Sequence, residues 1–132
     1  METRTVLLLE DDRSVRELLR VLLETEGYGI IEAVDGYDGI AKAEQELPDL
    51  MILDLMMPGM DGEAVLKALN ENPKLRSVPV LVVSGKYDSL ETLKDRVGEQ
   101  NIFPKPFEPT RMLDRIGELI GHPDDESSPG EA

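Results

Sequence analysis

Cysteine is absent from the 132-residue chain, and no long apolar run lies near its N-terminus. Without cysteine, the chain can form neither a disulfide framework nor a thiolate metal site. The first apolar run covers only residues 6–9, which is too short for a signal peptide or a membrane span. These absences predict a soluble, cytoplasmic protein that does not contact a membrane.

Basic residues are scarce, because 14 Lys and Arg face 28 Asp and Glu and give a formal net charge of −14. A surface this negative repels the phosphate backbone of nucleic acids, so we do not expect this chain to bind them by itself. The length of 132 residues suits one domain with a real core.

Apolar, partly β-branched runs alternate five times with segments of helical periodicity. We expect strands at residues 5–10, 29–34, 50–53, 79–84 and 101–103, and helices at 14–26, 37–46, 62–70, 88–97 and 109–120. This alternation favours a parallel sheet with helices on both faces. The prediction is an α/β, doubly wound, flavodoxin-like three-layer fold, with five strands in the order 2-1-3-4-5.

The first two helices have apolar residues at the spacing of a buried face. These faces are expected to hold Val15, Leu18, Leu19 and Leu22 in the first helix, and Ile40, Ala41 and the adjoining Leu47 in the second. The first helix begins either with a capping box of Ser14 and Glu17 or with Asp12 as its cap.

The last eleven residues differ in composition from the rest of the chain. Residues 122–132 contain four acids and three helix breakers, and their only apolar residue is the terminal Ala132. We therefore expect a domain over residues 1–121, followed by a disordered acidic tail or linker over 122–132. His122 is expected to be inert within this tail.

Acidic residues gather where two neighbouring strands of the predicted sheet end. Asp11 and Asp12 follow the first strand, and Asp54 ends the third. The chain reverses direction between these strands, which is where open α/β sheets bind ligands. Three converging carboxylates repel one another unless a cation joins them, and oxygen ligands select a hard ion such as Mg²⁺.

Two further polar residues end the fourth and fifth strands. Ser84 can donate its hydroxyl to an anion, and the ammonium of Lys105 can pair with a carboxylate or phosphate. Each of these residues alone has a plainer interpretation, as a turn former, a helix cap or an exposed charge. A nucleophilic carboxylate, a metal, a hydroxyl and a cation together predict an aspartyl-phosphate site.

The combination resembles the receiver domain, CheY-like, of two-component response regulators. The resemblance covers about residues 5–121 and rests on the acidic pair, residues 54–62, the dipeptide 84–85 and the tripeptide 105–107. It implies that Asp54 is the phosphoacceptor and that Ser84 occupies the Ser/Thr switch position. It also implies that Lys105 is the family's lysine, typically joined to Pro106 by a cis peptide.

The same resemblance implies a set of magnesium ligands. Asp12 would bind Mg²⁺ directly, Asp11 would hold it through water, and Asp54 and the carbonyl of Met56 would complete the protein's share. The phosphodonor would be a histidine kinase, a histidine phosphotransfer protein or a small acyl phosphate. The signal would reach a downstream protein through the face of the fourth helix, fifth strand and fifth helix.

The position three residues before the lysine departs from the family. Receivers commonly have Tyr or Phe there as a switch, whereas this chain has Ile102, with Phe103 expected on the opposite face of the strand. We expect the segment after Ser84 and the helix at 88–97 to transmit the signal instead.

Two competing functions remain open at this point. One is a Mg²⁺-dependent phosphatase with an aspartyl intermediate, but such enzymes need an acid two residues after the nucleophile, where this chain has Met56. The other is a constitutive interaction domain that has lost phosphotransfer, although every site residue is present. The resemblance favours a signalling module that is not an enzyme. The sequence names neither the kinase nor the target, nor whether the chain is part of a longer protein.

Overall fold

The computed structural model describes residues 4–55, 62–84 and 97–123. The strands are β1 (Thr5–Leu9), β2 (Gly29–Ala33), β3 (Leu50–Asp54), β4 (Val80–Ser84) and β5 (Ile102–Pro104). The helices are α1 (Arg13–Thr25), α2 (Gly36–Glu46), α3 (Gly62–Glu71) and α5 (Pro109–Ile120), with a 3-10 turn η1 at Glu99–Asn101. All five predicted strands and four predicted helices are confirmed. The helix expected at 88–97 falls almost wholly outside the described residues.

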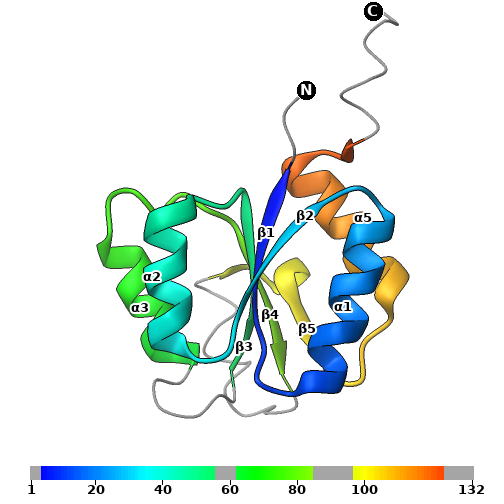
Figure 1. Cartoon of the computed structure of the whole chain (residues 1–132), viewed down its shortest axis with the longest axis horizontal. Coiled ribbons are helices and arrows are strands. Elements are labelled where there is room, and N and C mark those ends of the chain that lie inside the picture. The colour runs from blue at the N-terminus through cyan, green and yellow to red at the C-terminus, as the bar shows by residue number, and fades with distance from the viewer. Residues whose placement is uncertain (1–3, 56–61, 85–96, 124–132) are drawn as a thin grey trace, which may run out of the picture.

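The sheet is parallel, and its strands follow the order β2-β1-β3-β4-β5. This confirms the predicted doubly wound fold. Helices α2 and α3 cover one face, and α1 and α5 cover the other (Figure 1). The carboxyl ends of the strands therefore all lie at the same end of the sheet, at the bottom of the view.

The side chains of alternate strand residues pack in two separate hydrophobic cores, one on each face of the sheet. On the α2 and α3 face, Leu7 and Leu9 of β1 pack in one cluster of buried side chains. On the α1 and α5 face, Val6 and Leu8 pack in the other. A sheet buried on both faces explains why its strands are almost wholly apolar rather than alternating.

The buried face of α1 differs from the prediction. Leu19 and Leu23 are the buried residues of this helix, whereas Leu18 is 50% exposed. Rows of residues four apart, here 15, 19 and 23, follow the line along which the helix meets the sheet. Leu18 lies beside that row and faces solvent.

The prediction for α2 was also partly wrong, because Ala41 and Leu47 are exposed while Ala43 is buried. Leu47 lies just past the helix with a left-handed backbone, at φ 49°. The face toward the sheet consists of small residues, Gly36, Gly39 and Ala43. A Cβ atom at Gly39 would overlap the side chain of Leu9, so this glycine allows α2 to approach the sheet closely.

The end of the domain is tied to the amino end of the sheet. His122 Nε2 lies 2.6 Å from Glu26 Oε1, and the His122 ring meets the edge or face of Tyr28 at a centroid distance of 6.1 Å. Tyr28 donates its hydroxyl to the carbonyl of Gly121 at 3.1 Å. The side chain of His122, the first residue of the predicted tail, therefore contacts the domain. The predicted disorder further on concerns residues 124–132, which lie outside the described part.

Candidate functional site

The acidic residues gather at the carboxyl end of the sheet because β1 and β3 are neighbours. Leu9 pairs with Leu53 in the parallel register, so the residues that follow them lie side by side. Asp54 ends β3, while Glu10 and Asp11 follow β1. Carboxylate oxygens of these three residues all lie within 4.8 Å of one another. This group of Glu10, Asp11 and Asp54 is called the acidic cluster below.

Two members of the acidic cluster are buried. Glu10 is 1% exposed and Asp54 is 3% exposed, whereas Asp11 lies at the surface. Charged groups are rarely buried to this degree without a partner or a function. The cluster therefore combines a protected reactive position with an opening to solvent.

Lys105 provides a positive charge at the acidic cluster. Its Nζ lies 3.2 Å from Asp54 Oδ2 and 3.2 Å from Glu10 Oε1. Lys105 follows β5 directly, at the same end of the sheet as the two carboxylates. The peptide bond between Lys105 and Pro106 is cis, as the resemblance implied.

Two titratable groups at the acidic cluster, Glu10 and Lys105, have shifted pKa values. The pKa of the Glu10 carboxyl is raised from 4.5 to about 7, mainly by burial and then by the hydrogen bond with Asp54. For Lys105, burial lowers the pKa, but the negative charges of Glu10 and Asp54 outweigh burial and raise the pKa above its usual 10.5. The lysine is thus held as an ammonium, while Glu10 binds its proton until near neutral pH.

The structure gives Asp12 a different position from the one predicted. Asp12 is the N-cap of α1, and its Oδ1 accepts a hydrogen bond from the N–H of Val15 at 3.1 Å. Its own N–H donates to Glu10 Oε2 at 3.0 Å. The carboxylate of Asp12 is not a member of the acidic cluster, whereas that of Glu10 is.

Glu10 is the residue that sequence reasoning missed. The prediction extended the first strand to residue 10 and took the two aspartates after it as the site. The strand ends one residue earlier, at Leu9, which places Glu10 and Asp11 at the carboxyl end and Asp12 at the start of the helix. The helix signal itself could have shown this, because Asp12 was already one of the two candidate caps.

The remaining predicted residues are described in part. Ser84 is the last residue of β4 and pairs with Pro104 in the register, so its main chain lies at the same end of the sheet as Asp54. Met56 lies outside the described residues. Ile102 packs on the α2 and α3 face and Phe103 on the opposite face, which confirms their predicted orientations.

The acidic cluster fits a divalent cation. Glu10 Oε1 is buried and makes no hydrogen bond with the described residues, although it forms the ion pair with Lys105. Three carboxylates offer only oxygen donors, which suit hard cations such as Mg²⁺ or Ca²⁺. Such an ion would satisfy the buried oxygen and reduce the repulsion among the carboxylates.

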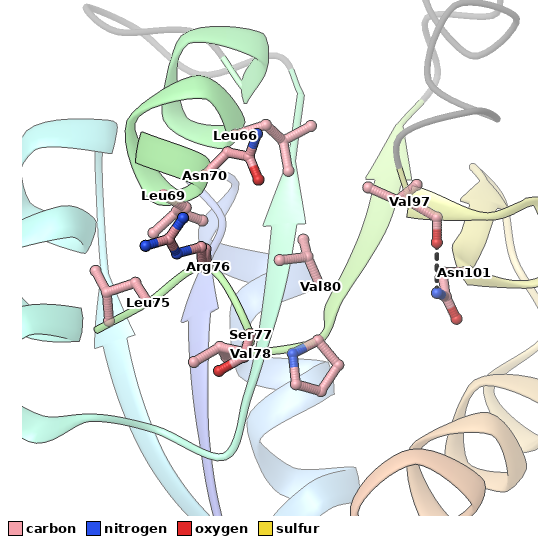
Figure 2. A pocket seen from close by; sticks show the side chains of 11 residues that line it. Leu66, Leu69, Asn70, Leu75, Arg76, Ser77, Val78, Val80, Val97 and Asn101 are labelled. Carbon is pink, nitrogen blue, oxygen red and sulfur yellow. Dashed lines mark hydrogen bonds between the residues drawn. The ribbon is translucent and has the colours of Figure 1, made fainter. Parts of the chain in front are cut away.

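A cavity lies at the other end of the sheet, where β4 begins. Its volume is about 330 Å³. Figure 2 shows side chains from α3 and the segment before β4 on one side of it, and Val97 and Asn101 on the other. Its lining mixes apolar side chains with four polar ones, from Asn70, Arg76, Ser77 and Asn101. Asn101 donates to the carbonyl of Val97 at 2.6 Å, the dashed line in the figure.

The sequence profile of the response regulator receiver domain matches residues 6–117. The chain belongs to the response regulator receiver family. It is thus a receiver domain of two-component systems, a signalling module whose standard role is to accept a phosphoryl group. The family predicted from the sequence motifs is confirmed.

Similar proteins include both long and short regulators. Over 124 residues, the chain is 34% identical to the DNA-binding dual master transcriptional regulator RpaA of Synechocystis sp., covering 90% of this chain and 50% of that protein. It is 31% identical over 112 residues to protein PilG of Pseudomonas aeruginosa, covering 84% of this chain and 83% of PilG. The chain spans about half the length of several longer relatives.

Solved structures show the same fold. The chemotaxis response regulator CheY4 of Vibrio cholerae superposes with a TM-score of 0.79 at 27% identity, covering 89% of this chain and 99% of CheY4. Among residues 4–55, 62–84 and 97–123, no helix is both long and apolar enough to cross a bilayer.

Proposed function

We propose that Asp54 is the phosphoacceptor of this receiver and that the acidic cluster holds Mg²⁺ during the transfer. The observation that carries the proposal is the position of Asp54. Its carboxylate is 3% exposed, lies 3.2 Å from the ammonium of Lys105, and is grouped with the carboxylates of Glu10 and Asp11. A buried nucleophile between a cation and a metal site is what phosphoryl transfer to a carboxylate requires.

The ligands proposed for Mg²⁺ are Asp11 and Asp54, with Glu10 holding bound water. The resemblance gave the direct role to Asp12, but the cap that Asp12 provides to α1 supports a transfer of that role to Asp11. Bound Mg²⁺ would neutralise part of the negative charge on the carboxylates and on the phosphoryl oxygens. The carbonyl of Met56 stays a predicted ligand.

The chain's own residues carry the chemical step. An oxygen of Asp54 attacks phosphorus and forms the acyl phosphate bond, while the bond from phosphorus to the donor breaks. With a phosphohistidine donor, the imidazole nitrogen keeps the electron pair of that bond. Lys105 stays protonated and offsets the charge that arrives. Ser84 is proposed to donate its hydroxyl to a phosphoryl oxygen.

The proposed donor is a histidine kinase or a histidine phosphotransfer protein in the cytoplasm, and small acyl phosphates would serve in vitro. The proposed output is a change in protein contacts at the face that contains β5 and α5. The charge added at Asp54 acts next to Lys105, which joins these two elements. The protein that reads this change is not named by the chain.

Labelling by an acyl phosphate tests the proposal. Wild-type protein with Mg²⁺ should gain the mass of one phosphoryl group, and Asp54→Asn should not. Asp49→Asn is the matched control, because Asp49 precedes the other end of β3, where its Oδ2 accepts from the N–H of Thr5 at 2.8 Å. Labelling of Asp54→Asn at the wild-type rate, or full labelling in EDTA, would contradict the assignment.

A further inference from the structure

Arg16 binds the acidic segment between β1 and α1 at three points. Its Nη1 donates to the carbonyl oxygens of Glu10 and Asp11, at 2.8 Å and 3.4 Å. Its main-chain N–H donates to the carbonyl of Asp12 at 2.9 Å. One residue thus contacts three consecutive carbonyl groups, two of which belong to members of the acidic cluster.

The geometry of α1 explains this contact. Asp12 caps the helix and Arg13 begins it, so Arg16 lies at the end of the first turn. Side chains on a helix lean toward its N-terminus, and a long one reaches the residues before the helix. Arg16 is also partly buried, so its charge is less screened by water than that of an exposed arginine.

We propose that Arg16 is a positioning residue of the metal site, which holds the main chain of Glu10 and Asp11 so that their carboxylates stay grouped with that of Asp54. This inference rests on the proposed function, because the cation concerned is the Mg²⁺ of the phosphotransfer step. Arg16 contacts neither the cation nor the phosphoryl group in this proposal. It acts through the main chain of the two residues.

The choice of acceptor atoms supports this role. Both contacts of Nη1 are with carbonyl oxygens, so they leave the carboxylate oxygens of Glu10 and Asp11 to other partners. An arginine paired directly with the Asp11 carboxylate would compete with a metal ion for its ligand.

Magnesium binding by full-length variants tests the inference. The variants are Arg16→Gln and Arg16→Lys, and the matched control is Arg13→Gln. Arg13 lies in the same turn of α1 and loses the same charge, but its side chain is 82% exposed and pairs with Glu17 at 3.8 Å. The measurements are the Kd for Mg²⁺ by calorimetry and the rate of labelling by an acyl phosphate as a function of Mg²⁺ concentration.

Arg16→Gln should raise the Kd for Mg²⁺ by about tenfold, the lower end of the effect of residues that orient metal ligands. The half-saturating Mg²⁺ concentration for labelling should rise by the same factor, while the rate at saturating Mg²⁺ stays within about threefold of wild type. The Kd of Arg16→Lys should lie between those of wild type and Arg16→Gln, because one ammonium cannot reproduce the planar, forked guanidinium of arginine. Arg13→Gln should change the Kd by less than about twofold.

Other outcomes would overturn the inference. An Arg16→Gln variant whose Kd stays within about twofold of wild type would show that the main chain holds its position without the arginine. An equal rise of the Kd for Mg²⁺ in Arg13→Gln would show that the effect comes from the charge of α1 and not from the contacts of Arg16. If Arg16→Gln does not fold, a wild-type Kd in Arg16→Lys overturns the inference instead. A wild-type chain that binds no Mg²⁺ would overturn the proposed function as well, which separates the two failures.

Discussion

The two ends of the sheet differ in what is buried there. At the carboxyl end, Glu10 and Asp54 are almost fully buried and pair with Lys105. At the amino end, the buried side chains Leu69 and Leu75 border a cavity of about 330 Å³, and no charged residue of its lining is buried. This difference indicates that buried charge identifies the reactive end of this fold.

Each end is stabilised in a different way. Burial of carboxylates lowers the free energy of unfolding unless partners compensate. The carboxyl end therefore contributes less to stability than an apolar core of the same size would. At the amino end, leucine side chains such as Leu69 and Leu75 are buried, and His122 lies 2.6 Å from Glu26. If this description is correct, changes at one end should leave the properties of the other unchanged.

The largest expected effect is on stability at the amino end. Leu75 is 1% exposed, so Leu75→Ala should lower the free energy of unfolding by ~2–5 kcal/mol. Leu18→Ala is the control, because Leu18 is 50% exposed and its truncation should cost less than ~0.5 kcal/mol. Denaturant unfolding gives both values. A change in Mg²⁺ affinity of Leu75→Ala beyond about threefold would show that the two ends are coupled.

The next effect concerns pH at the carboxyl end. The pKa of Glu10 is raised to about 7, so its ionised fraction rises about tenfold between pH 6 and pH 8 and Mg²⁺ affinity should rise by a similar factor. Glu10→Gln has no titrating group at this position and should lose most of this dependence. Calorimetric titrations at the two pH values test this, with Asp49→Asn expected to behave as wild type.

The stability of the metal-free protein should depend on pH in the opposite direction to its Mg²⁺ affinity. Without metal, folded Glu10 keeps a proton that the unfolded chain loses near pH 4.5, so the free energy of unfolding should fall as the pH rises from about 4.5 to 7. In Glu10→Gln this contribution should vanish. Metal-free stability in Glu10→Gln that falls as steeply as in wild type would assign the pH dependence to another group.

The smallest effect is expected at the end of the domain. The His122 and Glu26 side chains are each about one-third exposed and 2.6 Å apart, so solvent screens their interaction. A double-mutant cycle with His122→Ala and Glu26→Ala should give a coupling energy of ~0.5 kcal/mol. A coupling energy of zero would show that the contact of His122 with Glu26 does not stabilise the domain.

Sequence reasoning predicted most of the fold because the strands are nearly continuous apolar runs with clear breakers between them. The order of the strands followed from their number and from the right-handed connections. The faces of the helices were harder to predict. Apolar residues surround α1 on more than one side, and only packing against the sheet decides that Leu23 is buried and Leu18 is not.

The structure groups Asp11, Asp54 and Lys105, which the sequence had singled out, and adds Glu10 beside them. Asp54 is the last residue of β3, and Lys105 directly follows β5. Helix- and strand-breaking residues mark both strand ends clearly in the sequence. The segment from Glu10 to Asp12 contains three acids in a row, and composition cannot assign them to strand, loop or cap. Neighbouring residues point their side chains in different directions, so the sequence alone does not show which of these acids face Asp54. The hydrogen bond from the N–H of Val15 to Asp12 identifies Asp12 as the cap of α1.

The most direct test of the central claim compares Mg²⁺ binding by Asp11→Asn and Asp12→Asn. The account places the carboxylate of Asp11 in the acidic cluster and uses that of Asp12 to cap α1. Asp11→Asn should therefore weaken Mg²⁺ binding by at least about tenfold. Asp12→Asn should stay within about threefold of wild type, because asparagine caps helices as well as aspartate does. A larger loss in Asp12→Asn than in Asp11→Asn would contradict the account.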